Sequence, residues 1–219
     1  MLNYVVDPAL LQRFVPQETE LDQHEGQTYV SLIGFEFNKT RILGRAVPFH
    51  QAFEEVNLRF YVRRGNRRGV VFIRELVPKV AVTAVARLAY GENYSCAPMS
   101  HRVDIDPSGV YAEFTWGTGA ATCSISARIS GESYLPEEGS LAQFITEHYW
   151  GYALRAGSTV EYQVDHPQWR VSDAITAKCL GNAARYYGLE FADLLAAAPQ
   201  SAFLAEGSAV TVFKGVPIG

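Results

Sequence analysis

Two neighbouring segments in which apolar and polar residues alternate constrain the fold of this chain more than any other feature. From Ala121 to Ser130 every second residue is apolar, and the residues between them are Thr, Ser or Arg. The preceding segment 110–116 has the same pattern, and the segment 117–119 (Gly-Thr-Gly) separates the two. A period of two is typical of antiparallel strands that bury one face and expose the other. The two segments therefore predict a β-hairpin.

Further segments with strand or helix patterns are spread along the whole chain. Gly65 and Asn66 form a turn signal between two of the strand segments, because both residue types reach positive φ readily. The expected strands are residues 28–37, 55–63, 69–76, 159–165 and 208–213. The expected helices are residues 8–14, 78–90, 140–154, 174–187 and 191–198. Many strands with a few inserted helices predict an α+β fold that is mainly antiparallel β, built as a barrel or a sandwich.

The composition is that of an ordinary globular protein. The chain has 219 residues, of which 48% are hydrophobic and 19% are charged, so there is enough apolar material for a core. Because no linker interrupts the sequence, a single domain over residues 1–219 is expected. The formal net charge of −4 argues against a nucleic-acid partner.

The sequence also lacks the features of a membrane or metal protein. It has no apolar run of the roughly 18 residues that a transmembrane helix needs, and no signal-peptide pattern at its start. Cys96, Cys123 and Cys179 are odd in number and far apart, which suits reduced thiols in the cytoplasm. Neither these cysteines nor the five histidines have the spacing of a metal motif. We therefore expect no metal and no other cofactor.

Lys79 is the residue that most suggests chemistry. It follows Pro78, which ends an apolar strand and fits the first turn of the helix expected over residues 78–90. The positive end of that helix and the apolar residues around it both disfavour an ammonium ion. Lys79 is thus a candidate amine nucleophile. The alternatives are a surface lysine at the start of a helix, or a lysine paired with a carboxylate.

A row of polar residues on the strand before Lys79 has two interpretations. Alternation places four side chains on one face of that strand: Glu55, Asn57, Arg59 and Tyr61. This face is either a solvated outer surface or the lining of an interior that binds something small and charged, with Arg59 paired to Glu55. On the neighbouring strand Arg74 and Glu75 point to opposite faces, so only one of them can share such a site.

These residues predict a pocket formed by three segments. The first two, residues 55–61 and 74–79, are joined by a short hairpin, and the third, residues 90–101, follows the helix expected over 78–90. The third segment would add Tyr94, Met99 and His101. A small-molecule ligand is therefore the expected partner, and a homo-oligomer is left open. The basic cluster of Arg63, Arg64, Arg67 and Arg68 is typical of a solvated hairpin tip.

Several segments together resemble the YqjF-like family of uncharacterised bacterial proteins. They are FEEVNLRFYV (53–62), RRGVVFIRELVPK (67–79), LAYGENYSCAPMSH (88–101), GSLAQFITEHYWGY (139–152), VDHPQW (164–169) and GSAVTVFKG (207–215). The resemblance extends over residues 10–215, nearly the whole chain. It implies the acetoacetate-decarboxylase-like fold, a mostly antiparallel, cone-shaped β-barrel with flanking helices.

A second resemblance is to the acetoacetate decarboxylases of the same superfamily. They carry an Arg-Glu pair shortly before Pro-Lys, and the lysine forms a Schiff base with the substrate ketone. Arg74, Glu75, Pro78 and Lys79 resemble a version of this motif that is one residue shorter. The resemblance implies catalytic roles for Lys79, Arg74 and Glu75. The chain departs from the family pattern at Val80, where the decarboxylases have a second lysine that helps to activate the first.

Two functional hypotheses from different classes follow. In the first, the protein is an enzyme that acts on a small oxo-acid or carbonyl compound through an imine at Lys79, with Arg74 or Arg59 holding a carboxylate. In the second, it is a barrel without catalytic activity that binds a small amphipathic or aromatic ligand. The ligand would contact Tyr61, Tyr90, Tyr94, Met99 and Trp169. The orientation of Lys79, into the barrel or toward solvent, distinguishes the two.

Overall fold

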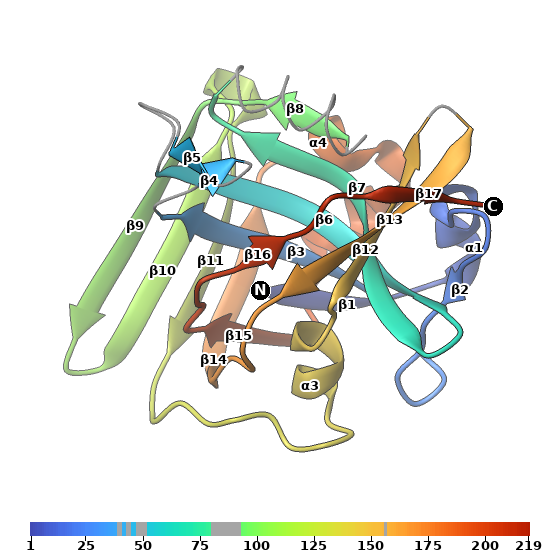
Figure 1. The fold of residues 1–219 in the computed structure, drawn as a ribbon. Coiled ribbons are helices and arrows are strands. Elements are labelled where there is room, and N and C mark those ends of the chain that lie inside the picture. The colour runs from blue at the N-terminus through green and yellow to red at the C-terminus, as the bar shows by residue number, and fades with distance from the viewer. Residues whose placement is uncertain (39–40, 43–44, 47–51, 80–92, 156) are drawn as a thin grey trace.

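The computed structural model describes residues 1–38, 41–42, 45–46, 52–79, 93–155 and 157–219, and strands dominate this part of the chain (Figure 1). The strands are β1 (Leu2–Val6), β2 (Glu20–Leu21), β3 (Thr28–Phe37), β4 (Arg41–Ile42), β5 (Arg45–Ala46), β6 (Phe53–Arg64), β7 (Arg67–Val77), β8 (Tyr94–Cys96), β9 (Met99–Asp106), β10 (Gly109–Trp116), β11 (Cys123–Ile129), β12 (Trp150–Arg155), β13 (Ser158–Asp165), β14 (Val171–Leu180), β15 (Ser201–Ala205), β16 (Thr211–Val212) and β17 (Val216–Ile218). The helices are α1 (Pro8–Leu11), α3 (Leu141–Thr146), α4 (Ala184–Tyr187) and α5 (Ala192–Ala196), with 3₁₀ turns η1 (Gln12–Phe14), η2 (Gly119–Ala121) and η3 (Leu189–Phe191). No helix within these ranges has the length and apolar character that crossing a bilayer requires.

Most of the strands form one extended sheet. Its order is β16-β13-β12-β7-β6-β3-β1-β15-β14-β11-β10-β9, and β17, β2 and β8 pair with β13, β6 and β7 beside this path. Neighbouring strands are antiparallel except where β12 and β8 run parallel to β7. The mainly antiparallel α+β fold is therefore confirmed. Among the described strands no pairing joins β9 to β16, so closure of the sheet into a barrel is not confirmed.

The hairpin predicted from alternation is present as β10 and β11. The two strands pair over seven positions, with Phe114 opposite Ile125 and Trp116 opposite Cys123. Trp116, Cys123 and Ile125 are buried, as the alternating pattern requires of the apolar face. The strand expected over residues 28–37 coincides with β3. Of the strand expected over residues 208–213, only β16 forms.

The β6–β7 hairpin lies in the middle of the sheet and contains an irregularity that matters for the site. Gly65 supplies the turn with a φ of 58°. From the turn the strands pair regularly as far as Arg59 opposite Phe72, but the next pair is Leu58 with Arg74. Ile73 is therefore an extra residue, a β-bulge that shifts the alternation of β7.

The helix expected over residues 140–154 is much shorter than predicted. Its start is confirmed, because the Ser140 side chain caps α3 by accepting a hydrogen bond from the backbone N–H of Gln143. The helix ends at Thr146, and the residues from Trp150 onward form strand β12. Gly151 and the large aromatic residues beside it favour a strand over a helix interior. A Cβ atom on Gly151 would lie 2.1 Å from the ring of Tyr162 on β13, so this strand pair also requires glycine.

The helix expected over residues 174–187 is wrong for most of its length. The segment up to Leu180 belongs to β14, which pairs with β11, and only α4 at its end is helical. Pairing in the sheet overrides the helical preference of the alanines, because Ala177 and Cys179 continue the apolar face of β11. Gly181, with a φ of 90°, ends the strand before α4. The expected helices at residues 8–14 and 191–198 form, in two pieces and in shortened form respectively. The helix expected over 78–90 lies outside the described residues from position 80 onward.

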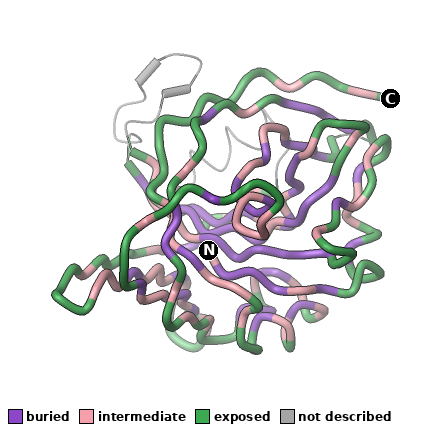
Figure 2. Tube along the Cα trace, turned by 90° about the horizontal axis from the view of Figure 1, so that it is seen from below, coloured by how far each residue is buried: buried purple, intermediate pink, exposed green. Residues whose placement is uncertain are grey.

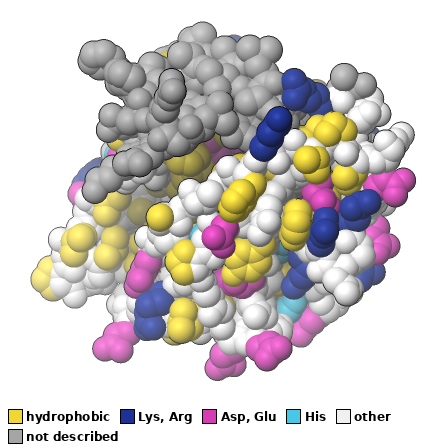
Figure 3. Space-filling model, in the orientation of Figure 1, with side chains coloured by type: hydrophobic (Ala, Val, Ile, Leu, Met, Phe, Trp, Pro, Cys, Tyr) yellow, Lys and Arg dark blue, Asp and Glu magenta, His cyan; other side chains and the backbone are white. Residues whose placement is uncertain are grey.

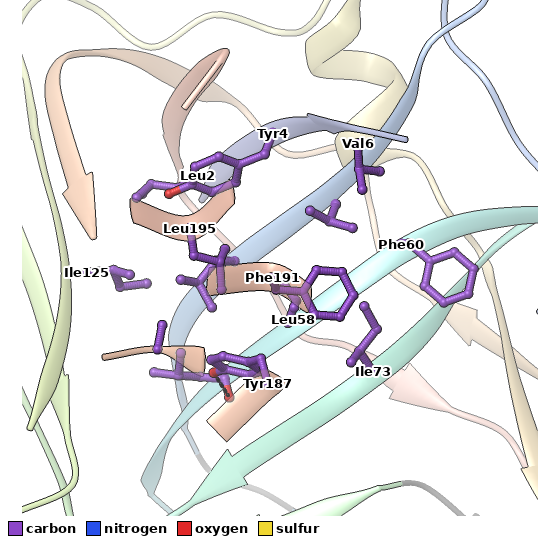
Figure 4. Close-up of a cluster of buried hydrophobic side chains, with 14 of the residues drawn as sticks. Leu2, Tyr4, Val6, Leu58, Phe60, Ile73, Ile125, Tyr187, Phe191 and Leu195 are labelled. Carbon is purple, nitrogen blue, oxygen red and sulfur yellow. Dashed lines mark hydrogen bonds between the residues drawn. The ribbon is translucent and has the colours of Figure 1, made fainter. Parts of the chain in front are cut away.

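The central strands consist largely of buried residues, and the exposed residues lie mainly in turns and at the periphery (Figure 2). The buried side chains form two clusters. On one face, which we call the main-core face, Leu58 and Phe60 pack with Phe191 and Leu195 from η3 and α5 (Figure 4). The other face carries Tyr61 and Val70, which pack against Phe144 and Ile145 of α3. We call this second side of β6 and β7 the α3 face.

Candidate functional site

Three chain segments meet at the end of the β6–β7 hairpin that lies away from its turn. β6 begins there at Phe53 and β7 ends there at Val77. β8 pairs in parallel with the last residues of β7, so that Tyr94 lies beside Glu75 and Cys96 beside Val77. The segments from which a pocket was predicted are therefore neighbours in space.

Four polar residues, which we call the carboxyl cluster, gather where these segments meet: Glu55, Asn57, Glu75 and Tyr94. Glu55, Asn57 and Glu75 are 1%, 2% and 3% exposed. The carboxylate of Glu55 accepts hydrogen bonds from Asn57 Nδ2 at 2.8 Å and from the Tyr94 hydroxyl at 3.0 Å. Glu75 lies opposite Asn57 in the strand pairing and therefore shares its face. This end of the α3 face is thus polar and buried rather than a solvated outer surface.

Burial changes the acidity of Glu55. It raises the pKa of this carboxyl group from 4.5 to about 7, although the hydrogen bonds from Asn57 and Tyr94 and the charge of Arg59 act in the opposite direction. A carboxyl group that is partly protonated near neutral pH can give or take a proton during a reaction. Strongly shifted acids of this kind are concentrated at functional sites.

Lys79 lies next to this cluster. Extending the pairing of Val56 with Leu76 by three residues brings Lys79 opposite Phe53, on the same face as Glu55. The side chain is half-buried, and its Nζ donates a hydrogen bond to the carbonyl oxygen of Ala52 at 2.9 Å. The Nζ atom also lies 5.6 Å from the centre of the Phe53 ring. The sequence analysis did not anticipate Ala52 and Phe53, although alternation places Phe53 on the face of Glu55.

Arg59 and Tyr61 lie on the α3 face as well but are engaged elsewhere. Arg59 donates a hydrogen bond from Nη2 to the carbonyl oxygen of Ile145 on α3 at 3.0 Å, and no ion pair joins it to Glu55 among the described residues. The Tyr61 hydroxyl lies 2.5 Å from Ser31 Oγ, which in turn donates to Asn3 Oδ1. The polar row of β6 is thus divided: Glu55 and Asn57 belong to the carboxyl cluster, whereas Tyr61 lies beneath α3.

The remaining predicted site residues lie on other surfaces. Arg74 is opposite Leu58 and therefore lies on the main-core face, away from Glu75. Met99 packs against the main core. His101 contacts Glu54 through Nδ1 at 3.0 Å and stacks on Phe114. Within the residues that the structure describes, no three potential metal ligands lie close enough together to hold an ion.

Each arginine of the basic cluster at the β6–β7 turn has a carboxylate partner within the chain. Arg63 pairs with Glu20, and Arg68 donates to Asp22 at 2.6 Å. Arg64 and Arg67 both contact Glu161, a carboxylate that is only 4% exposed. Because each arginine faces a carboxylate, these residues connect the turn to the neighbouring segments.

A shallow depression of about 400 Å³ lies on the outer face of β10, β11 and β14. Six residues line it: Tyr111, Ser126, Arg128, Thr176, Ala177 and Lys178. None of them belongs to the predicted site, and Arg128 is already paired with Asp106 at 3.2 Å. The depression therefore adds nothing to the candidate site.

His148 is a second buried titratable group on the α3 side of the sheet. It is 6% exposed, it packs against Tyr61 and Phe144, and neither ring nitrogen has a hydrogen bond from the described residues. The nearest carboxylate oxygen recorded for it, Asp22 Oδ2, is 3.9 Å from Nε2. Burial lowers the pKa of His148 from 6.5 to about 4, against the opposing effect of Asp22.

The His148→Phe variant should be less sensitive to acid than the wild type. Between pH 6.5 and about 4 the unfolded chain binds a proton at His148 that the folded protein does not, so the contribution of this group to the stability of the wild type falls as the pH falls. Phenylalanine cannot bind this proton, and its ring suits the aromatic surroundings. Urea unfolding at several pH values measures the difference, and parallel pH profiles for the two proteins would contradict the assignment.

Comparison with solved structures identifies the class of this fold. An acetoacetate decarboxylase from Legionella pneumophila superposes with a TM-score of 0.66 at 13% identity, covering 100% of this chain and 83% of that one. The enduracididine biosynthesis enzyme MppR, solved in complex with pyruvate, superposes with a TM-score of 0.62 at 12% identity. This match covers 98% of this chain and 82% of the MppR chain. The chain therefore has the acetoacetate-decarboxylase-like fold.

The sequence match is more specific. Residues 1–209 match the DUF2071 family of uncharacterised conserved proteins, and the chain belongs to this family. It is also 26% identical over 173 residues to the uncharacterised protein YqjF of Bacillus subtilis (strain 168), a match that covers 78% of this chain and 71% of YqjF. The resemblance to YqjF-like proteins is thus confirmed.

Proposed function

We propose that the protein binds a small oxo-acid or a related carbonyl compound at the carboxyl cluster and forms an imine with it through Lys79. The observation that carries this proposal is the placement of Lys79 on the same face of the hairpin as Glu55, whose pKa burial raises to about 7. An amine beside an acid that can hold a proton near neutral pH is the combination that imine formation requires.

The proposed chemistry follows from these two groups. The neutral amine of Lys79 attacks the carbonyl carbon and forms a C–N bond. The carbonyl oxygen leaves as water after it has accepted two protons, one from the amine nitrogen and one from the protonated form of Glu55. The proton that remains on nitrogen makes the product a protonated imine, which draws electrons from the neighbouring carbon, as a decarboxylase or lyase needs.

Arg59 is the better of the two arginines considered for the substrate carboxylate. It shares the α3 face with Glu55, whereas Arg74 lies on the main-core face. Its Nε atom is buried without a hydrogen-bond partner among the described residues. An unused guanidinium donor of this kind suits a carboxylate ligand. The fold neighbour MppR, which was solved with the 2-oxo acid pyruvate, supports the choice of ligand class.

Borohydride trapping tests the proposal. The protein is incubated with pyruvate and a panel of other 2- and 3-oxo-acids, reduced with borohydride and digested for peptide mass mapping. We expect an adduct on Lys79 that is absent from Lys79→Arg and retained in Lys178→Arg, a matched change at an exposed lysine. Adducts spread over the surface lysines, or no adduct on Lys79 with any carbonyl, would contradict imine formation.

One observation favours the alternative of ligand binding without catalysis. The Nζ atom of Lys79 already contacts the Ala52 carbonyl and the Phe53 ring, as a structural lysine would. Of the aromatic residues proposed to line such a site, Tyr94 belongs to the carboxyl cluster and Tyr90 lies outside the described residues. Tyr61 lies beneath α3, and the ring of Trp169 stacks on that of His166 with 4.2 Å between the ring centres. Calorimetric binding of an oxo-acid that leaves no trapped adduct would support this alternative.

A further inference from the structure

Strand β9 is an edge strand of the main sheet in the part of the chain that the structure describes. Among the described strands it pairs only with β10, over an uninterrupted register from Met99 to Asp106. Proteins usually protect an edge strand with a bulge, a proline or charged side chains, of which lysine is the most effective. The β9 sequence MSHRVDID contains no lysine or proline, and its register has no bulge.

The backbone of β9 has its free hydrogen-bonding groups on alternate residues. The tight turn of Pro107 and Ser108 closes on the pair of Asp106 with Gly109. Hydrogen-bonded and non-hydrogen-bonded pairs alternate along an antiparallel ladder. The even-numbered residues therefore bond to β10, and the backbone N–H and C=O groups of His101, Val103 and Ile105 point away from it.

Two of these odd-numbered residues, Val103 and Ile105, also form an exposed apolar stripe. Val103 is 53% exposed and Ile105 is 80% exposed. Both lie on the side of the hairpin that carries Ala112 and Phe114, which continues the main core beyond the edge of the sheet. Hydrophobic side chains gather over this hairpin at the lower left of Figure 3.

The charged side chains on the other face of β9 indicate which kind of strand can pair with it. Arg102 and Asp104 flank Val103 on the opposite face and form an ion pair of 2.6 Å with each other. If two copies of β9 pair in antiparallel fashion about Val103, then Arg102 of each copy lies opposite Asp104 of the other. The same register pairs Val103 with Val103 and His101 with Ile105, so that all the outward backbone groups are used. The strand is therefore complementary to itself in charge, shape and hydrogen bonding.

We propose that two copies of this chain associate through β9 about a two-fold axis and join their sheets into one. The contact is isologous, since each copy contributes the same strand. It buries Val103 and Ile105 of both copies in a common apolar strip, and it exchanges the two internal Arg102–Asp104 pairs, one in each copy, for two pairs between the copies.

Charge reversal tests this register. Arg102→Asp should weaken the dimer about tenfold or more, because the change acts twice across the axis and places carboxylates opposite each other. Asp104→Arg should have a similar effect. The double variant R102D/D104R restores opposite charges and should return the dissociation constant to within a few-fold of the wild type. Analytical ultracentrifugation over a wide concentration range measures the dimer.

Two further variants separate the edge contact from general effects on folding. Val103→Pro removes an N–H that points away from β10 and should abolish the dimer while the circular dichroism spectrum stays unchanged. Ile105→Lys should also weaken the dimer, whereas Leu189→Lys, at an equally exposed leucine, should not. A wild type that remains monomeric at all concentrations, or a dimer insensitive to both Arg102→Asp and Ile105→Lys, overturns the proposal.

Discussion

Replacing Phe60 with alanine should lower the free energy of unfolding by about 3–5 kcal/mol, the cost typical of removing a fully buried phenylalanine side chain. Phe60 is 0% exposed and lies in the centre of β6, between Val30 on β3 and Val71 on β7. Its ring packs in the main core, where the surrounding strands leave little freedom to close the cavity (Figure 4). Because domains of this kind are stable by only about 5–15 kcal/mol, the variant should unfold at a much lower urea concentration.

Phe213→Ala is the matched control for this variant. Phe213 is 46% exposed, and surface substitutions of this kind usually change stability by less than about 0.5 kcal/mol. Urea unfolding followed by tryptophan fluorescence compares both variants with the wild type. Equal losses in the two variants would mean that β6 is not the centre of the core.

The Glu55→Gln variant should change how stability depends on pH. The pKa of Glu55 is raised in the folded protein, so between pH 4.5 and about 7 the folded state keeps a proton that the unfolded chain has released. The wild type therefore loses stability at this group as the pH rises through that window. The shift from 4.5 to about 7 corresponds to about 3 kcal/mol at 1.36 kcal/mol per pKa unit. Glutamine has no acidic proton to lose, so above pH 7 the variant should have a free energy of unfolding about 3 kcal/mol higher than that of the wild type.

The difference in stability between Glu55→Gln and the wild type at each pH is more informative than the pH profile of the wild type alone. His148 contributes a slope of the opposite sign over nearly the same window, because its pKa is lowered from 6.5 to about 4. The two effects largely cancel in the wild type. Glu138→Gln, at an exposed glutamate, should leave the profile unchanged. A stability difference between Glu55→Gln and the wild type that stays constant with pH would show that Glu55 titrates normally.

The strands were predictable where the evidence for them is local. Alternation from Ala121 to Ser130 identified β11, and the Gly65-Asn66 turn identified the β6–β7 hairpin, since both patterns involve neighbouring residues. The segment 174–180 was not predictable in the same way. Its alanines prefer a helix, and only pairing with β11, about 50 residues earlier, makes it a strand.

The sequence predicted that the segments of the candidate site meet, but not how their side chains are divided among contacts. Alternation placed Glu55, Asn57, Arg59 and Tyr61 on one face, and the structure keeps them there. The division of that face depends on Arg59 reaching the carbonyl of Ile145, 86 residues away in the chain. The separation of Arg74 from Glu75 follows from alternation, but the register that decides which of them faces Asn57 includes a bulge, for which the sequence has no clear signal.

That bulge has a consequence for how sequences of this kind are aligned. Side chains along a strand repeat every two residues, so a single added or lost residue changes the phase and sends every later side chain to the other face. Ile73 is such an added residue, and it stands directly before the Arg-Glu pair whose distance from Pro-Lys is one residue shorter here than in the decarboxylase motif. Counting backward from Lys79 along the sequence can therefore match residues that point in opposite directions. Positions near this hairpin are better compared by their strand partners on β6, where Phe53, Glu55 and Asn57 keep an unbroken phase.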